Sequence, residues 1–324
     1  MTSSILVYVG LDLVGDGVMK LPFLSALRSL YPEARVTWLA GQGKTVYAGL
    51  LAPLLTGLVD EVIEDAGIGV SAGELLRRPL SGRRFDLVID TQRRVMTSLV
   101  LKRIRHGKFI SAAAGWALSD AMPATGKAKR PSMIGQMYAL LEAASGKPVA
   151  VPPPVSLSSE LLAEAMKRLP DGPRYIGLAP GAGGKHKCWP LGNYLEIGVK
   201  LAGEGWTPVF LIGPAERDWE TGIRAALPQA VLPLTDADGP PLTMALGTRL
   251  AAAVANDSGT GHMLAAAGVP LLSLFGPTAP EKFAPAAARL TVIRAQEFGA
   301  EDMAAIPVEP VMAALKRLVT SPRS

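Results

Sequence analysis

A carboxylate between two glycines follows the first apolar run of the chain. Residues 5–9 (ILVYV) are typical of a buried strand, and Asp16 comes soon after them, ahead of a helical pattern at residues 21–30. A carboxylate in a turn at the carboxyl end of a strand can accept a proton from a hydroxyl nucleophile. Capping of the following helix is the alternative role for Asp16, and we expect Asp12 to be a solvated loop residue.

A glycine-rich basic loop lies between an apolar run and a helical pattern in the middle of the chain. Its sequence is APGAGGKHKCWPLGNYLEI, residues 179–197. Glycines let the backbone approach a phosphate closely, and lysines together with a helix N-terminus offer donors and positive charge. The loop matches neither the Walker A motif nor the GxGxxG motif, so it indicates either another kind of phosphate site or a solvated basic loop. Trp189 is expected to be a packing anchor.

A third segment places small polar residues where a strand runs into a helix. It reads NDSGTGH, residues 256–262, and its hydroxyl and backbone N–H groups at a helix start suit a diphosphate or sugar hydroxyls. For His262, in the first helical turn, a ligand contact and a structural role are equally expected. The nucleophile elbow GxSxG is not formed around Ser258, which argues against a serine hydrolase.

Six Lys and Arg residues surround an apolar stretch at residues 91–108 (TQRRVMTSLVLKRIRHGK). A basic amphipathic segment can lie on an anionic membrane surface or bind the phosphates of a substrate. A solvated charged face is the alternative, and the residue types do not choose between the two.

Short apolar runs rich in branched residues alternate with helical patterns, which is typical of buried parallel strands in the α/β class. The expected strands are residues 5–9, 36–40, 87–90, 175–180, 208–213, 251–257 and 270–276. Three consecutive prolines within residues 147–156 mark a linker, which predicts one domain at residues 1–152 and a second at 153–324. We therefore expect two similar open sheets, with ligands in a cleft at the carboxyl ends of the strands.

Composition limits the class of protein. The chain has 324 residues, a net charge of +5, 6% aromatic residues and one cysteine. A single cysteine forms no intramolecular disulfide, which makes the cytoplasm the expected location. No apolar run reaches the roughly 18 residues that span a bilayer. Scarce aromatic residues and the lack of an RNA-binding motif argue against a nucleic-acid partner, whereas the positive charge favours phosphates or anionic lipids.

Three segments together resemble glycosyltransferase family 9, the bacterial heptosyltransferases that build the inner core of lipopolysaccharide. They are GDGVMKLPFLSALRSLYP (15–32), PGAGGKHKCWPLGNYLEI (180–197) and NDSGTGHMLAAAGVPLLSLFGPT (256–278), in the order that the family shows. The runs at 58–64 and 85–92 are similar to strands of the family's first domain. The resemblance covers about residues 1–285.

The resemblance implies a GT-B fold, with two facing Rossmann-like domains, an interdomain cleft, the acceptor on the first domain and the nucleotide-sugar on the second. It implies transfer of a sugar with inversion, typically heptose from ADP-heptose, to a lipopolysaccharide-core or lipid-linked acceptor. Neither a bound metal nor a cofactor is expected, because the ADP-sugar is a substrate. Peripheral contact with the inner face of the cytoplasmic membrane is expected. By analogy, a terminal helix at residues 308–318 crosses back to the first domain.

Site residues follow from the resemblance, position by position. Asp16 matches the family's general base and Lys187 matches the lysine that holds the donor phosphates, so both are expected to be catalytic. An inverting transfer needs these two properties, a base on the acceptor hydroxyl and positive surroundings for the leaving diphosphate. The expected donor-binding residues are Gly181, Gly183, Lys187, Glu216, Asp257, Ser258, Gly259, Thr260, Gly261 and His262. The expected acceptor-binding residues are Asp16, Gly17, Gln92, Arg93 and Arg94.

The chain departs from the family pattern around the expected acceptor site. Residues 10–13 (GLDL) stand where the family often has a basic residue and small hydroxyl residues, and Arg93 and Arg94 stand where it commonly has a glycine. A divergent acceptor specificity with donor binding retained is therefore expected. The alternatives are a family member that uses another nucleotide sugar or acceptor, and a non-catalytic nucleotide-sugar-binding scaffold. Asp16 and Lys187 argue against the scaffold.

Overall fold

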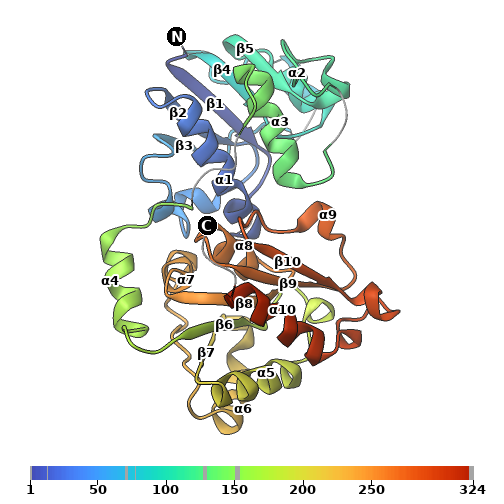
Figure 1. Cartoon of the computed structure of the whole chain (residues 1–324). Helices are drawn as coiled ribbons and strands as arrows, with labels where there is room; N and C mark the ends of the chain where they lie inside the picture. Colours follow the sequence, from blue (N-terminus) through green and yellow to red (C-terminus); the bar gives the residue numbers. More distant parts are fainter. Residues whose placement is uncertain are drawn as a thin grey trace. The chain divides into compact units, whose positions relative to one another are not determined.

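The chain forms two compact units, unit 1 (Met1–Pro153) and unit 2 (Pro154–Ser324). The structure is a computed structural model that describes residues 2–12, 14–69, 72–76, 78–126, 130–149 and 154–320. Residues 150–153 of the expected linker, and with them the expected boundary after residue 152, lie outside the described residues. Each unit is built on one parallel sheet covered by helices (Figure 1).

Unit 1 has a five-stranded parallel sheet with the order β3-β2-β1-β4-β5. Strand β1 lies at its centre because its residues are apolar from Ile5 to Val9 and are buried on both faces. Helices α1 and α3 pack against each other over one face, while α2 packs against Leu6 and Tyr8 on the other. The elements are β1 (Ser4–Val9), α1 (Val14–Leu30), β2 (Arg35–Ala40), β3 (Glu61–Ile63), β4 (Arg84–Asp90), α2 (Val95–Leu101), β5 (Arg105–Ser111) and α3 (Met133–Ser145).

Unit 2 repeats this plan with the strand order β10-β9-β8-β6-β7. Helices α5 and α10 contribute to the core on one face of the sheet, and α4, α7 and α8 contribute to the core on the other. Helix α10, expected by analogy to cross back to the first domain, buries Val311 and Leu315 against β8 and β9 of its own unit. The elements are α4 (Ser159–Arg168), β6 (Tyr175–Ala179), α5 (Leu191–Gly203), β7 (Thr207–Phe210), α6 (Glu220–Ala226), α7 (Pro240–Gly247), β8 (Leu250–Asn256), α8 (Gly259–Ala266), β9 (Leu271–Phe275), α9 (Pro280–Phe283), β10 (Leu290–Arg294) and α10 (Val308–Thr320).

The carboxyl ends of the parallel strands meet at one edge of each sheet. Strand order reverses between β1 and β4 in unit 1 and between β6 and β8 in unit 2. Ligands of doubly wound sheets bind at the carboxyl edge beside such a reversal. The expected site residues all lie in segments that follow β1, β4, β6, β7 or β8, so the fold places them at these two edges.

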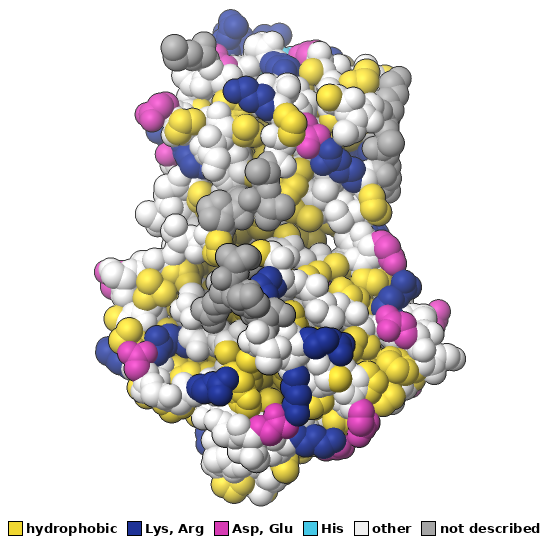
Figure 2. Space-filling model, in the orientation of Figure 1, with side chains coloured by type: hydrophobic (Ala, Val, Ile, Leu, Met, Phe, Trp, Pro, Cys, Tyr) yellow, Lys and Arg dark blue, Asp and Glu magenta, His cyan; other side chains and the backbone are white. Residues whose placement is uncertain are grey.

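No helix in the described part of the chain is both long and apolar enough to cross a bilayer. On the face shown in Figure 2, Lys and Arg side chains are interspersed with Asp and Glu over each unit. A continuous basic stripe, the usual electrostatic footprint of a nucleic-acid-binding surface, is not present on this face.

Candidate functional site

Asp16 lies inside helix α1, as its third residue, and not in a turn before the helix. We expected the helix to start near Leu21, because glycine and proline interrupt most helical patterns; that start is wrong, since the helix begins at Val14. Asp16 therefore does not hold the cap position, which precedes Val14. A carboxylate in the first turn is favoured by the helix dipole.

Close packing explains the glycine after Asp16. A Cβ atom on Gly17 would lie 2.6 Å from side-chain atoms of both Val46 and Leu51. The Tyr47 hydroxyl donates a hydrogen bond of 2.7 Å to the Gly17 carbonyl. Gly17, expected to bind the acceptor, is thus a buried contact that lets the segment around residue 47 pack on the first turns of α1.

A cavity of about 250 Å³ adjoins Asp16 within unit 1. Asp16, Gln92 and Arg93 line it, together with an apolar part formed by Leu11, Met19, Met133, Met137 and Leu140. The Arg93 guanidinium donates to the Gln136 amide oxygen at the rim, over 3.0 Å. Arg94, also expected at the acceptor, is not among the described lining residues; its carbonyl accepts hydrogen bonds from Ser98 in α2.

Asp90 is a residue of this cavity that the sequence analysis did not single out. It ends β4, is fully buried, and accepts hydrogen bonds from the Ser98 and Ser111 hydroxyls and from the Gln92 amide. Burial raises its pKa to about 6 even though the three donors act in the opposite direction. The one available signal was its position as the last residue of an apolar strand.

The raised pKa of Asp90 predicts the pH dependence of an Asp90→Asn variant. Below about pH 3 the carboxyl is protonated in both the folded and the unfolded chain; as pH rises to about 6, only the unfolded chain readily releases the proton. The wild type should therefore lose about 2–3 kcal/mol of stability across this pH range, whereas the variant, which has no carboxyl at this position, should not. An asparagine can still accept from the Gln92 amide, and Ser98 can turn its hydroxyl to the Arg94 carbonyl.

Thermal unfolding at pH 3 and pH 7 measures this difference. We expect Asp90→Asn to match the wild type at pH 3 and to exceed its melting temperature at pH 7. Asp86→Asn is the control in the same strand, because Ser3 and Ser4 lower the pKa of Asp86 to about 2 and its loss should destabilise the protein at pH 7. A melting temperature of Asp90→Asn below that of the wild type at pH 7 would contradict the assignment.

Asp12 was expected to be a solvated loop residue, and this expectation is wrong. Its side chain is fully buried and forms an ion pair with Lys20 of α1. Trp38 Nε1 and Thr45 Oγ1 each donate to its second oxygen over 3.1 Å. The sequence held no local signal for this role, because two of the three partners follow Asp12 by 26 and 33 residues.

The basic segment 91–108 contains helix α2 and the first half of strand β5 rather than one amphipathic element. Lys102 donates to the Leu118 carbonyl over 2.8 Å, and Lys108 donates to the carbonyls of Ala143 and Ala144 in the last turn of α3. These two lysines hold backbone within unit 1. Neither lysine is simply part of a solvated charged face. Contact of the segment with a membrane stays a prediction.

In unit 2, Lys187 and Asp257 form an ion pair, with 3.0 Å between Nζ and Oδ2. The Thr278 hydroxyl donates to the same carboxylate oxygen over 2.7 Å. Lys187 ends the short 3₁₀ helix η5 (Lys185–Lys187) after β6, Asp257 follows β8, and Thr278 follows β9. Two motifs, the loop with Lys187 and both ends of the segment 256–278, thus meet at one point of the carboxyl edge, where the Lys187 side chain remains 29% exposed.

Asn256, the residue before Asp257, holds this edge together. Its Nδ2 donates to the Pro180 carbonyl over 2.7 Å, and its Oδ1 accepts from the Trp189 amide and the Tyr194 hydroxyl, both at 3.1 Å. Trp189 is fully buried and packs edge-on against Tyr194, so its expected role as a packing anchor is confirmed. The loop that carries Lys187 is therefore fixed at both ends by one amide side chain.

The NDSGTGH segment forms the start of helix α8. The Ser258 hydroxyl accepts a hydrogen bond of 3.3 Å from the Gly261 amide and thereby caps the helix. Gly259 and Thr260 are the first two residues of α8, where backbone N–H groups have no partner within the helix. His262 is half-buried in the first turn of α8, and its backbone N–H donates a hydrogen bond to the Ser258 carbonyl. This helix start can present donors to an anion.

Glu216 lies against the glycine-rich loop. It is in the 3₁₀ helix η6 (Pro214–Trp219) after β7, and its carboxylate accepts from the Gly213 amide over 3.0 Å. A Cβ on Gly181 would lie 2.6 Å from the Glu216 carboxyl carbon, so a larger residue there would displace this carboxylate. Gly183 is exposed with no atom within 4 Å of such a Cβ, and sterics do not require a glycine there.

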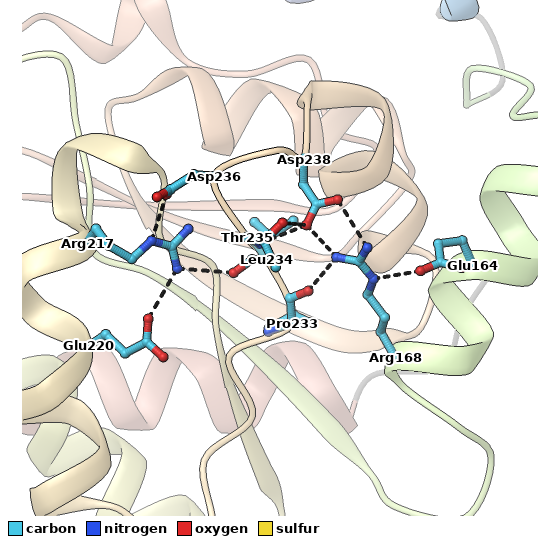
Figure 3. Close-up of polar contacts among 9 residues, drawn as sticks. All are labelled: Glu164, Arg168, Arg217, Glu220, Pro233, Leu234, Thr235, Asp236 and Asp238. Carbon is cyan, nitrogen blue, oxygen red and sulfur yellow. Dashed lines mark hydrogen bonds and ion pairs between the residues drawn. The ribbon is translucent and has the colours of Figure 1, made fainter.

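A second cavity, of about 140 Å³, lies in unit 2 beside the start of α8. Its lining includes Gly213, Thr260 and Met263 and the loop at residues 234–240. Two arginines hold that loop, as Figure 3 shows: Arg168 donates to the Pro233 carbonyl and to both oxygens of Asp238, and Arg217 donates to the Leu234 carbonyl and to Asp236. The Arg168 guanidinium lowers the pKa of Asp238 to about 2, so this clamp stays charged at neutral pH.

Known proteins match the chain in sequence. Residues 74–306 match the family model for glycosyltransferase family 9 (heptosyltransferase), a range that includes the unit 2 site and leaves out Asp16. Lipooligosaccharide heptosyltransferase 2 of Haemophilus influenzae is 36% identical over 126 residues, which cover 37% of this chain and 36% of the relative. Lipopolysaccharide heptosyltransferase 1 of Pseudomonas aeruginosa is 37% identical over 126 residues, 38% of this chain and 34% of the relative. The aligned segments span about a third of these curated relatives.

Solved structures match the chain over nearly its whole length. A glycosyl transferase family 9 protein from Veillonella parvula has a TM-score of 0.75 and 20% identity, covering 98% of this chain and 97% of that one. The ADP-heptose lipopolysaccharide heptosyltransferase II of E. coli has a TM-score of 0.67 and 22% identity, covering 98% of each chain. These likenesses show the GT-B fold, as expected. With a family model that matches most of its length and the family's fold in both units, the chain belongs to glycosyltransferase family 9, the heptosyltransferase family.

Proposed function

We propose that this protein is an inverting glycosyltransferase that moves heptose from ADP-heptose to a lipopolysaccharide-core or related acceptor, without a bound metal or cofactor, at the inner face of the cytoplasmic membrane. The observation that carries the proposal is the cluster of Lys187, Asp257 and Thr278 beside the start of helix α8. The named relatives, which are heptosyltransferases, support it.

Unit 2 offers what a nucleotide-sugar needs. The Lys187 ammonium and the first N–H groups of α8 provide positive charge and donors for a diphosphate, and such groups stabilise a leaving group whose negative charge grows in the transition state. Glu216 can accept hydrogen bonds from ribose hydroxyls. The 140 Å³ cavity next to Thr260 has room for part of a nucleobase.

Unit 1 offers the base. Asp16 takes the proton of an acceptor hydroxyl while that oxygen attacks the anomeric carbon, the new C–O bond forms and the bond from that carbon to the diphosphate oxygen breaks. ADP leaves, and a single displacement inverts the anomeric configuration. Gln92 and Arg93, which share the 250 Å³ cavity with Asp16, would bind the acceptor.

A calorimetric titration with ADP, UDP, GDP and CMP, each with and without EDTA, tests the proposal. Binding of ADP alone, unaffected by EDTA, is the expected result. Preference for another nucleotide would discard ADP-heptose while keeping a glycosyltransferase, and loss of binding in EDTA would overturn metal independence. Failure of all four nucleotides to bind would overturn the donor site itself.

Lys187→Ala should weaken ADP binding by about tenfold to a hundredfold. The reason is that a charge-assisted hydrogen bond to phosphate contributes roughly 1–3 kcal/mol and that Asp257 would lose its ion pair and repel the phosphates. Lys185→Ala is the matched control, because Lys185 is an exposed lysine of the same 3₁₀ helix. Equal dissociation constants for the two variants would refute the assignment of Lys187.

A further inference from the structure

Helix α1 presents two opposite charges to the unit 1 cavity. Asp16 and Lys20 are four residues apart on this helix, and both line the cavity. On a helix, an acidic residue four positions before a lysine is well placed to pair with it. In this structure the Lys20 ammonium binds the carboxylate of Asp12 instead.

Hydrogen bonds from the core of unit 1 fix the Asp12 carboxylate beside this lysine. Its side chain is fully buried, and the Trp38 indole and the Thr45 hydroxyl each donate to it over 3.1 Å. Trp38 is a fully buried residue of strand β2, and Thr45 caps the short 3₁₀ helix that packs on Gly17. Donors fixed in the core hold the Asp12 carboxylate in place, and a lysine beside it is attracted to it. The place of Lys20 is therefore set by the core of unit 1.

We propose that Asp12 is a positioning residue: by binding Lys20 it keeps the ammonium group away from Asp16, so that Asp16 remains a base without an ion pair. The role of Asp16 in this inference rests on the proposed function. An ammonium group on Asp16 would favour its ionised form and make it a weaker proton acceptor for the substrate hydroxyl. Asp12 thus protects the reactivity of a carboxylate that lies one helical turn from a lysine.

The other charged groups around Asp16 do not replace Asp12. Arg93, which also lines the cavity, donates a hydrogen bond to Gln136. The Asp90 carboxylate is buried and accepts three hydrogen bonds of its own. From the segment packed on the other side of α1, the Tyr47 hydroxyl bonds to the Gly17 carbonyl. Among the described residues, Asp12 is the carboxylate that pairs with Lys20.

A crystal structure of full-length Asp12→Asn tests the inference without any need for activity. We expect the Lys20 ammonium to move to within hydrogen-bond distance of the Asp16 carboxylate, because asparagine provides no charge to hold it. A lysine that stays at the side chain of position 12 would overturn the inference. If Asp12→Asn does not fold, Thr45→Val removes one donor only and should show the same movement at partial occupancy.

The pH profile of ADP release from ADP-heptose supplies a readout that a purely structural pair would not move. In Asp12→Asn the acid limb of kcat/KM should shift to lower pH by about one unit and the plateau should fall about tenfold. Adding Lys20→Met should return the limb to its wild-type position. Asp60→Asn is the matched control, because it breaks the 2.8 Å pair with Arg28 in the same helix and should reduce stability without shifting the limb.

The outcomes separate the two claims. A wild-type protein that releases no ADP contradicts the proposed function, while the crystal structure still decides where Lys20 goes. An active wild type with the same acid limb in Asp12→Asn contradicts the positioning role alone. A shifted limb that Lys20→Met does not restore would show that Asp12 acts by another route, and it would also overturn the inference.

Discussion

Asp16→Asn is expected to lower kcat for sugar transfer by a factor of about 10² to 10⁴. Asparagine has nearly the same size but cannot accept the proton of the acceptor hydroxyl. Asp16 lies in the first turn of α1 and is only partly buried, so the variant should fold. Its affinity for ADP should stay unchanged, because the residues that we assign to the diphosphate belong to unit 2.

The measurement is the initial rate of ADP release from ADP-heptose in the presence of lipopolysaccharide-core acceptors, with ADP affinity followed by calorimetry. Glu33→Gln serves as the control, because it removes an exposed carboxylate just after α1 and should leave both quantities unchanged. A variant that turns over as fast as the wild type would rule out Asp16 as the base. A variant that loses ADP affinity instead would assign Asp16 to donor binding.

The fold could be predicted from the sequence wherever strands are buried on both faces. All seven expected strands occur, and they include the central β1, β4, β6 and β8. Strands β5 and β10 were not expected, and β3 was expected only through the resemblance of residues 58–64 to a strand of the family. All three lie at sheet edges and are partly exposed. Edge strands often carry charged side chains, and β5, with Arg105 and Lys108 in its first half, therefore looked like part of a basic amphipathic segment.

The start of α1 shows where local rules fail. Glycine and proline weaken a helix, but Gly17 is needed for the contact with Val46 and Leu51, and Pro22 is tolerated inside the helix. Packing across the unit overrides local propensity here. The burial of Asp12 also depends on contacts across the unit, because its donors Trp38 and Thr45 are distant in the sequence. Contacts of this kind leave no trace in residue type or spacing.

The unit 2 site was better predicted, because its motifs are local and the fold brings them together. Lys187 and Asp257 were both expected at the donor, and the structure joins them in one ion pair. Asn256 stood inside the same motif without an expected role. Its partners precede it by 62 to 76 residues, so only the three-dimensional structure shows what it does.

Asn256→Leu is expected to lower the free energy of unfolding of unit 2 by roughly 3–5 kcal/mol. Leucine has a similar shape but leaves the Pro180 carbonyl and the buried Trp189 amide without this partner, and it reduces the hydrogen bonds of the Tyr194 hydroxyl to the one of 3.3 Å with the Ala179 carbonyl. Each buried polar group without a hydrogen bond costs about 1–3 kcal/mol. Urea unfolding followed by circular dichroism and tryptophan fluorescence measures the loss.

Ser273→Ala provides the opposite case in the neighbouring strand β9. Ser273 is as deeply buried as Asn256, but its hydroxyl has no hydrogen-bond partner among the described residues, so its removal should change stability by less than about 1 kcal/mol. Equal destabilisation by the two variants would mean that burial, and not the three hydrogen bonds, accounts for the effect of Asn256. Because the Asn256 amide also fixes the backbone on both sides of Lys187, folded Asn256→Leu should bind ADP more weakly than Ser273→Ala. A folded variant with unchanged ADP affinity would show that the lysine loop keeps its position without this anchor.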